Sequence, residues 1–314
     1  YLHWGVQAWA IYVVVGLALA YAIHRRRRPV SIRWALEPLF GRAVRGAWGN
    51  VIDVIALVGT MFGVATSLGL GVLQISAGLE AAGMPDLGTG IQIAIIAVIT
   101  VVVLFSVLSG VARGRKWLST FNLLLAAALL VFVIIAGQTE HILREWVQST
   151  GAYIQNYVGL SFTVSAFQGS AGEEWQAAWT SFYWGWWISW APFVGIFIAR
   201  VSKGRTVRQF VMGVLIVPTL VGILWFAVLG GSALARELAE PGSMLTADGS
   251  VDLQGALFQL FTHLPATQVL TIGAIILIAI VAGIVAMSIF GGGEEDRPAV
   301  GIVGGSSLNA TLGA

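Results

Sequence analysis

The chain has 314 residues, of which 57% are hydrophobic and only 10% are charged. Soluble domains carry about a quarter charged residues, so this composition excludes an ordinary soluble protein and requires a lipid bilayer as solvent. The sequence contains no cysteine, which excludes disulfides and thiolate metal sites. The net charge of +2 is small. We expect the chain to contact membrane lipid and to bind no nucleic acid.

Seven apolar stretches predict an all-α integral membrane protein. Each is close to the ~20 residues that a helix needs to cross the hydrocarbon core, and helices are expected because backbone groups in lipid must bond within their own segment. The predicted transmembrane spans are 4–24, 51–73, 89–110, 118–136, 177–199, 207–229 and 268–290. We expect the Gly/Ser-rich residues 291–314 to form a flexible tail.

Lysine and arginine residues gather on one side of these spans. The clusters at 25–28, 113–116 and 200–208 all fall on the same side when the seven spans alternate in direction. The positive-inside rule makes that side cytoplasmic. Two connecting segments add surface helices: residues 30–48 predict a basic amphipathic helix on the inner leaflet, and residues 138–160 predict an outer-surface helix.

Aromatic residues concentrate in the first and fifth spans. Residues 179–190 contain five tryptophans, and residues 3–12 read His-Trp-Gly-Val-Gln-Ala-Trp-Ala-Ile-Tyr. An interfacial belt explains residues 3–12 taken alone, but tryptophan normally occurs singly at membrane edges, which residues 179–190 do not match. Because tryptophan faces are the best side-chain surface for a cation, the two groups together favour an aromatic cage for a quaternary ammonium ligand.

Pro192 lies within the tryptophan-rich span. Proline removes a helix hydrogen bond, so we expect it to interrupt the helix and free a backbone carbonyl near residue 188. Broken backbone inside a membrane is tolerated where it lines a site. The alternative is bulky packing around a proline kink, although membrane helix interfaces prefer small residues.

The second span has small and hydroxyl residues and a carboxylate at its inner end. Gly59 and Gly63 are expected to allow close helix approach, while the hydroxyls of Thr60 and Ser67 either ligate a hard cation such as Na⁺ or bond back to their own helix. For Asp53 we expect an exposed residue near a helix N-terminus, with a functional intramembrane carboxylate as the alternative. The four histidines have no metal-binding spacing.

A family resemblance rests on four segments. Residues 184–210, which begin Trp-Gly-Trp-Trp-Ile-Ser-Trp-Ala-Pro-Phe, resemble the signature of the betaine/choline/carnitine transporters. Residues 3–12, 52–71 and 109–119 are similar to that family in the expected order. The resemblance covers about residues 1–290. It implies part of a leucine-transporter-type inverted-repeat bundle, a homotrimer, and a place in the bacterial inner (cytoplasmic) membrane.

The resemblance also implies roles for particular residues. Four aromatic side chains would surround a trimethylammonium group, a fifth would line the path on the inner side, and two more would flank the box. The box consists of Trp4, Trp9, Tyr12 and Trp187. Trp190 lines the path, and Trp184 and Trp186 flank the box.

The same resemblance raises the question of the coupling ion. Thr60 and Phe193 match one sodium site of sodium-coupled members of the family. Val64 stands where that site has a second hydroxyl, and a valine side chain cannot ligate a cation. Coupling to Na⁺, coupling to H⁺ and exchange therefore all stay open.

The chain departs from the family at both ends. The family has three helices before the first span, and its last two helices are absent from the sequence printed above. We therefore expect a fragment or a rearranged copy, which inserts in the membrane but does not accumulate substrate alone.

The combined prediction is a secondary transporter of glycine betaine, choline or carnitine, with no cofactor other than Na⁺ or H⁺ as coupling ion. A membrane enzyme would need an intramembrane nucleophile or metal cluster, which the spans lack. A channel or sensor that binds quaternary ammonium would need a polar pore-lining ring. An inactive fragment of such a transporter is the remaining alternative.

Overall fold

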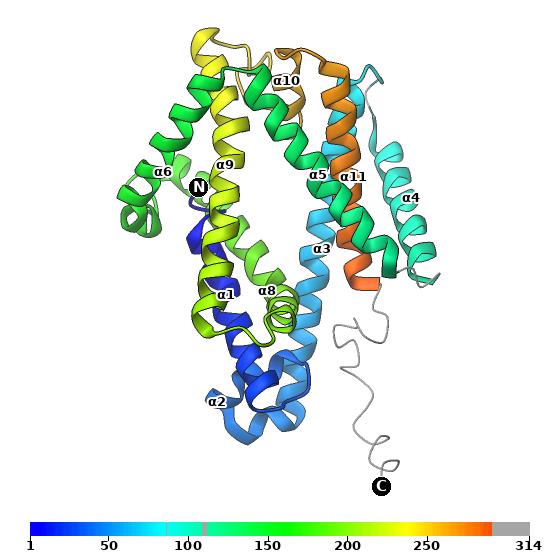
Figure 1. Ribbon diagram of the computed structural model, residues 1–314, viewed down its shortest axis with the longest axis vertical. Coiled ribbons are helices and arrows are strands. Elements are labelled where there is room, and N and C mark those ends of the chain that lie inside the picture. Colours follow the sequence, from blue (N-terminus) through cyan, green and yellow to red (C-terminus); the bar gives the residue numbers. More distant parts are fainter. Residues whose placement is uncertain (86, 109–111, 291–314) are drawn as a thin grey trace. The chain divides into compact units, whose positions relative to one another are not determined.

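The computed structural model describes residues 1–85, 87–108 and 112–290, and of residues 106–108, 112–116 and 287–290 it describes the backbone alone. Within these ranges every regular element is helical, so the predicted all-α fold is confirmed. The elements (Figure 1) are α1 Val6–Ala20, η1 Tyr21–Arg25, η2 Ile32–Leu36, α2 Glu37–Phe40, η3 Gly41–Arg45, α3 Ala47–Ala81, α4 Thr89–Leu108, α5 Ala112–Ala136, α6 Thr139–Phe162, α7 Gly169–Trp175, η4 Gln176–Ser181, α8 Phe182–Val201, α9 Val207–Ala239, α10 Ala256–Thr262 and α11 Thr267–Phe290. The predicted flexible tail at 291–314 lies outside the described residues.

The helices have the length and composition of a membrane protein. Among the described residues, six helical stretches are long and apolar enough to cross a bilayer, and Thr89–Phe105 is a shorter apolar helix. The six are Val6–Arg25, Ala47–Ala81, Trp117–Ala136, Gly169–Val201, Val207–Ala239 and Thr267–Ala286. Observed helices overlap all seven predicted spans, while the boundaries and direction of each crossing stay predictions.

The chain separates into two compact units. The first, which we call the aliphatic unit, comprises Tyr1–Leu2, Val64–Thr163 and Leu220–Gly291. The second, which we call the aromatic unit, comprises His3–Gly63 and Val164–Thr219. The long helices α3 and α9 each contribute one part to each unit.

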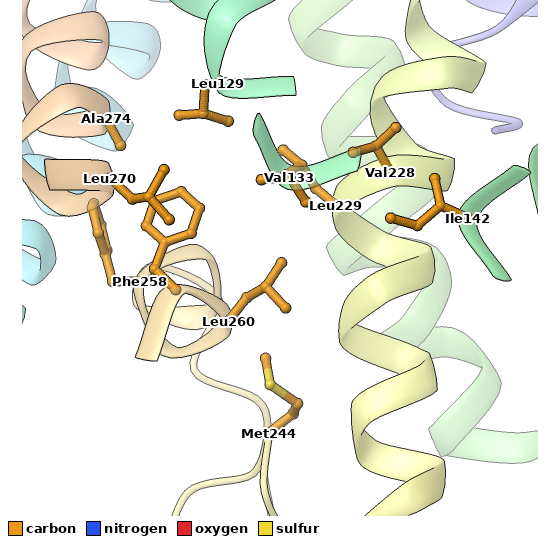
Figure 2. Close-up of a cluster of buried hydrophobic side chains, with 11 residues drawn as sticks. Leu129, Val133, Ile142, Val228, Leu229, Met244, Phe258, Leu260, Leu270 and Ala274 are labelled. Carbon is orange, nitrogen blue, oxygen red and sulfur yellow. The ribbon is translucent and has the colours of Figure 1, made fainter. Parts of the chain in front are cut away.

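The aliphatic unit is built on α11, which packs against α4 and α5. Its core is a cluster of side chains from α5, α6, α9, α10, α11 and the segment between α9 and α10, and these side chains point toward one another (Figure 2). Phe258 and Phe261 are almost completely buried there. A Cβ atom at Gly78 would lie 2.7 Å from Cζ of Phe258, so glycine lets α3 approach α10 closely. The core consists of Leu129, Val133, Ile142, Val228, Leu229, Met244, Phe258, Leu260, Phe261, Leu270 and Ala274.

The aromatic unit is built on the contact between α1 and α8. The two backbones come close at a pair of glycines: a Cβ atom at Gly195 would lie 2.7 Å from Cγ1 of Val15 and 3.4 Å from the backbone nitrogen of Gly16. Small residues allow such approach between membrane helices. At the end of this contact Nε2 of His24 lies 2.8 Å from the carbonyl of Ala199 and donates to it. The glycine contact fixes which faces of α1 and α8 meet.

The segment 30–48 is not the single amphipathic helix that was predicted. It forms the short pieces η2, α2 and η3, because Pro38 lies in the first turn of α2 and Gly41 has a φ of 54° that stops it. Leu39 and Phe40 are nevertheless exposed beside Arg42. The prediction of a helix at 138–160 agrees with α6.

Pro192 does not interrupt its helix as predicted. It lies inside α8, which continues from Phe182 to Val201. The irregular turn comes earlier, in the π-helical segment η4. Proline still cannot donate to the carbonyl of residue 188, but flanking hydrogen bonds and the packing against α1 keep the helix continuous. The π-helical turn in η4 is a separate feature, which the sequence did not predict.

Candidate functional site

Trp187 lies at the centre of the aromatic unit's ring cluster. Its ring centroid is 5.2 Å from that of Trp4, 5.5 Å from that of Trp9 and 4.9 Å from that of Tyr12. The rings meet at interplanar angles of 75°, 68° and 52°, within the tilted and edge-to-face range that aromatic pairs prefer. The structure thus brings together the four residues that the resemblance assigns to one box.

These four side chains come from three local structures. Trp9 and Tyr12 are three residues apart on α1 and share a face, with centroids 5.6 Å apart. Trp187 is on α8 and faces them because of the glycine contact described above. Trp4 precedes α1 and lies 37% exposed, whereas Trp187 is 6% exposed. A ligand that reaches this cluster would therefore touch Trp4 more easily than Trp187.

The indole of Trp187 carries a polar group that packing does not satisfy. Its Nε1 is buried and has no hydrogen-bond partner within the described part of the chain. Buried polar groups are nearly always paired, and an unpaired one costs about 1–3 kcal/mol. A leucine at this position would fill space without that cost. Packing alone does not account for an indole at this position, which makes Trp187 a candidate binding residue.

The three remaining tryptophans of the predicted site lie around this group. Trp186 meets Trp4 at 5.8 Å and 88°, so it flanks the cluster directly. Trp190 pairs with Phe193 at 5.6 Å, one turn further along α8. A Cβ atom at Gly63 would lie 2.9 Å from Cδ1 of Trp190, so the indole rests on α3 at that glycine. The close approach predicted at Gly63 is therefore found at this position.

Trp184 belongs to a second aromatic group, centred on His3. The imidazole of His3 lies 5.5 Å from the rings of both Tyr183 and Trp184, and its Nε2 is 3.1 Å from Oγ1 of Thr180. Burial lowers the pKa of His3 because it disfavours the charged imidazolium. The sequence pattern indicated no separate role for His3 or for Thr180. The available signal was the four-residue spacing of Thr180 and Trp184, which places them on one helix face.

Thr60 binds its own helix. Its hydroxyl donates to the carbonyl of Ala56 at 2.8 Å and lies 3.4 Å from the carbonyl of Ser189. This is the local bonding that competes with ion ligation. Val64, one turn later, is 3% exposed and offers no oxygen. In the described residues no group of three or more His, Cys, Asp or Glu side chains is placed to hold a metal ion.

Asp53 is buried rather than exposed, which corrects the favoured prediction. It is 1% exposed, accepts hydrogen bonds from Oγ of Ser31 at 2.7 and 2.8 Å, and forms an ion pair with Arg33. The side chain of Arg33 is 14% exposed and also donates to Asn50 at 2.8 Å. Asp53 lies well inside α3, and it ties the segment before that helix to the helix itself. We assign it a structural role.

Comparison with known proteins agrees with the resemblance. The model of the betaine/carnitine/choline family transporters (BCCT) matches residues 1–289. An uncharacterized transporter of Mycobacterium tuberculosis is 50% identical over 277 residues, which are 88% of this chain and 46% of that protein. A glycine betaine transporter of Bacillus subtilis is 44% identical over 281 residues, or 89% of this chain and 54% of that protein. A glycine betaine/proline/choline/ectoine transporter of Vibrio parahaemolyticus is 42% identical over 304 residues, which cover 94% of this chain and 53% of that protein. The chain spans about half the length of these curated relatives.

Proposed function

The chain belongs to the betaine/carnitine/choline family of transporters, and on that premise we propose that it takes part in secondary transport of a trimethylammonium compound. Members of this family and the named relatives are transporters and not enzymes. The observation that carries the proposal is the contact of Trp4, Trp9 and Tyr12 with Trp187. The membrane we propose is the bacterial cytoplasmic membrane.

The chemistry of the ring cluster favours a methylated ammonium over a simple amine. A trimethylammonium group has no N–H to donate, so it gains little from hydrogen bonds and is held by ring faces. An ordinary ammonium group would lose its hydration without replacement. Glycine betaine is our leading candidate, with choline and carnitine as the others, because two relatives are named for glycine betaine transport.

A zwitterionic ligand could also accept a hydrogen bond from the unpaired indole N–H of Trp187. Nε1 of Trp187 is a donor only. A betaine carboxylate within its reach would accept that hydrogen bond, whereas choline would offer a neutral hydroxyl oxygen. Since hydrogen bonds to charged acceptors are roughly twice as strong as neutral ones, this donor favours glycine betaine over choline.

The coupling ion is proposed from the second span. With Thr60 bonded to Ala56 and valine at position 64, two of the expected oxygen contacts to Na⁺ are weakened or missing. We propose that transport depends weakly on Na⁺ and follows a proton gradient or substrate exchange. The measurement is uptake of labelled glycine betaine by vesicles that contain this sequence in its full-length context, with imposed Na⁺ or H⁺ gradients. A steep sigmoidal Na⁺ dependence would contradict this proposal.

The substrate proposal is tested by competition. The chain in lipid nanodiscs is equilibrated with labelled glycine betaine, and unlabelled glycine betaine, choline and glycine are added separately. We expect the two trimethylammonium compounds to displace the label and glycine to leave it bound. Displacement by glycine at similar concentrations would show that the rings do not select for methylation.

The homotrimer is also a proposal, carried by the family resemblance. Native mass spectrometry of the detergent-solubilised chain measures it directly. We expect a species of three copies, and a monomer at all concentrations would contradict the assembly.

A further inference from the structure

We propose that His3 is a positioning residue that holds Trp4 against Trp187, through a hydrogen bond to Thr180 and stacking on the aromatic rings at the start of α8. This proposal rests on the proposed function, because Trp4 matters for transport only if the ring cluster binds the substrate. It adds a residue that contacts no substrate in the proposed site.

Something other than α1 must fix the place of Trp4. Trp9 and Tyr12 are in α1, so the packing of α1 on α8 places them. Trp4 precedes the helix, and between them lies Gly5, an N-cap with no side-chain cap. Glycine is the residue with the greatest backbone freedom. The orientation of Trp4 therefore depends on its own ring contacts with Trp186 and Trp187 and on what holds the chain on its other side, at His3.

His3 is held by two rows of side chains. Trp175, Trp179 and Tyr183 follow one another at four-residue spacing, and their rings lie 5.9, 6.5 and 5.5 Å from the imidazole. Trp179 and Tyr183 stack at 5.8 Å and 11°, and the imidazole is nearly parallel to both, at 28° and 25°. The second row consists of Thr180 and Trp184, which also contact His3. The hydrogen bond to Thr180 and the stacked rings together fix the position of the imidazole.

The π-helical turn explains why both rows can reach the same imidazole. Thr180 and Trp179 lie in η4, whereas Tyr183 lies in α8. A π-helical turn has a wider helical repeat than an α-helix and often marks a functional site. Here it places a hydroxyl and an aromatic stack on one side of the helix, one turn before Trp187.

The link from His3 to the ring cluster is short. The next residue, Trp4, contacts Tyr183 at 6.0 Å and Trp187 at 5.2 Å. Tyr183 therefore touches both His3 and Trp4, so a displaced imidazole disturbs Trp4 through the backbone and through this shared ring. The neutral imidazole can either donate to or accept from Thr180, depending on its tautomer. Glutamine has both kinds of polar atom and is the conservative replacement.

The test uses the 314-residue chain in nanodiscs, labelled with 5-fluorotryptophan, with the ¹⁹F resonance of Trp4 assigned by Trp4→Phe. We expect His3→Leu and Thr180→Val each to move that resonance, the double variant to move it no further, and His3→Gln to restore it. Affinity for glycine betaine should fall about five- to tenfold in His3→Leu, the size expected for one lost hydrogen bond and its stack. His141→Leu, at an exposed histidine of α6, is the matched control.

Two outcomes would overturn the proposal. An unmoved Trp4 resonance in His3→Leu would show that His3 does not position the indole. A His3→Gln variant as impaired as His3→Leu would show that the hydrogen bond to Thr180 is not the cause. If the unchanged chain binds no glycine betaine, the proposed function fails, while the Trp4 resonance still decides whether His3 positions that ring.

Discussion

The aliphatic unit and the aromatic unit both bury side chains between helices, but they bury different kinds of residue. The core in Figure 2 consists of leucine, valine, isoleucine, methionine, alanine and two phenylalanines, none of which has a polar side-chain atom. The core of the aromatic unit includes Tyr12 and Trp187, with Trp9, Trp184 and Trp190 packed against it. The first set fills space efficiently, and the second does so at the cost of an unpaired indole N–H.

From this difference we expect different roles for the two units. Tight aliphatic packing maximises contacts and leaves no polar group to satisfy. A cluster of indoles offers the electron-rich ring faces that attract cations. Mutations in the two units should therefore separate stability from ligand binding.

Phe261→Ala should be the most destabilising of these changes. Phe261 is 0% exposed, and truncation of a buried phenylalanine costs about 3–5 kcal/mol because a cavity remains. Thermal unfolding in nanodiscs would show the loss, while the affinity of the remaining folded protein for glycine betaine should be unchanged. Phe167→Ala, at a fully exposed phenylalanine, is the control. A specific loss of affinity in Phe261→Ala would show that the two units are coupled.

Asp53→Asn tests whether stability and binding also separate inside the aromatic unit. Removing the carboxylate leaves the charge of Arg33 largely buried without its partner, at a cost of about 3 kcal/mol. We expect a lower unfolding temperature with little change in affinity. Glu140→Gln breaks an exposed ion pair with Arg144 and should change neither quantity. Equal stability of the two variants would remove the structural role assigned to Asp53.

Trp187→Leu should show the opposite pattern. The substitution leaves a cavity, but it removes the unpaired N–H together with the ring, so stability should fall less than in Phe261→Ala. Each cation–π contact contributes roughly 1–2 kcal/mol, and affinity for glycine betaine should therefore fall about five- to thirtyfold. Trp117→Leu, at an indole that is 75% exposed, serves as the control in titrations followed by calorimetry. Normal affinity in a folded Trp187→Leu variant would return Trp187 to a packing role.

Gly63→Ala should have the smallest effect. The added Cβ would lie 2.9 Å from the indole of Trp190, so the ring has to shift, at a cost of about 1 kcal/mol. Gly59→Ala is the matched control on α3, because a Cβ atom there meets nothing within 4 Å. The indole emission of the two variants, compared with Trp190→Phe, reports the shift. Identical spectra for Gly59→Ala and Gly63→Ala would mean that Trp190 does not rest on this glycine.

The helices could be predicted from sequence because their signal is local. Long apolar runs and small-residue spacing depend on neighbouring positions only, and observed helices overlap every predicted span. The prediction of one helix over residues 30–48 was wrong. The apolar and basic residues there have helical periodicity, but Gly41 adopts a left-handed conformation that ends the helix. The prediction that Pro192 interrupts its helix was also wrong. A proline lowers helix stability, but the sequence does not show whether packing against other helices compensates for that loss.

The site was only partly predictable, because its contacts join distant positions. The motif pointed to Trp187 and Trp9, but nothing in their spacing gives the geometry between α1 and α8. The burial of Asp53 depends on Ser31 and Arg33, which are 22 and 20 residues away in the sequence. His3 was missed for the same reason, since Thr180 is 177 residues distant.

The central claim, that indole faces hold a trimethylammonium group, is tested most directly by the methyl resonance of bound glycine betaine. The ligand is labelled with ¹³C in its methyl groups, bound to the chain in nanodiscs, and observed by solid-state NMR. Ring currents should move the methyl resonance upfield on binding, and Trp187→Leu should reduce that displacement in the ligand that still binds. Saturable binding with a methyl resonance at its free position would contradict the account.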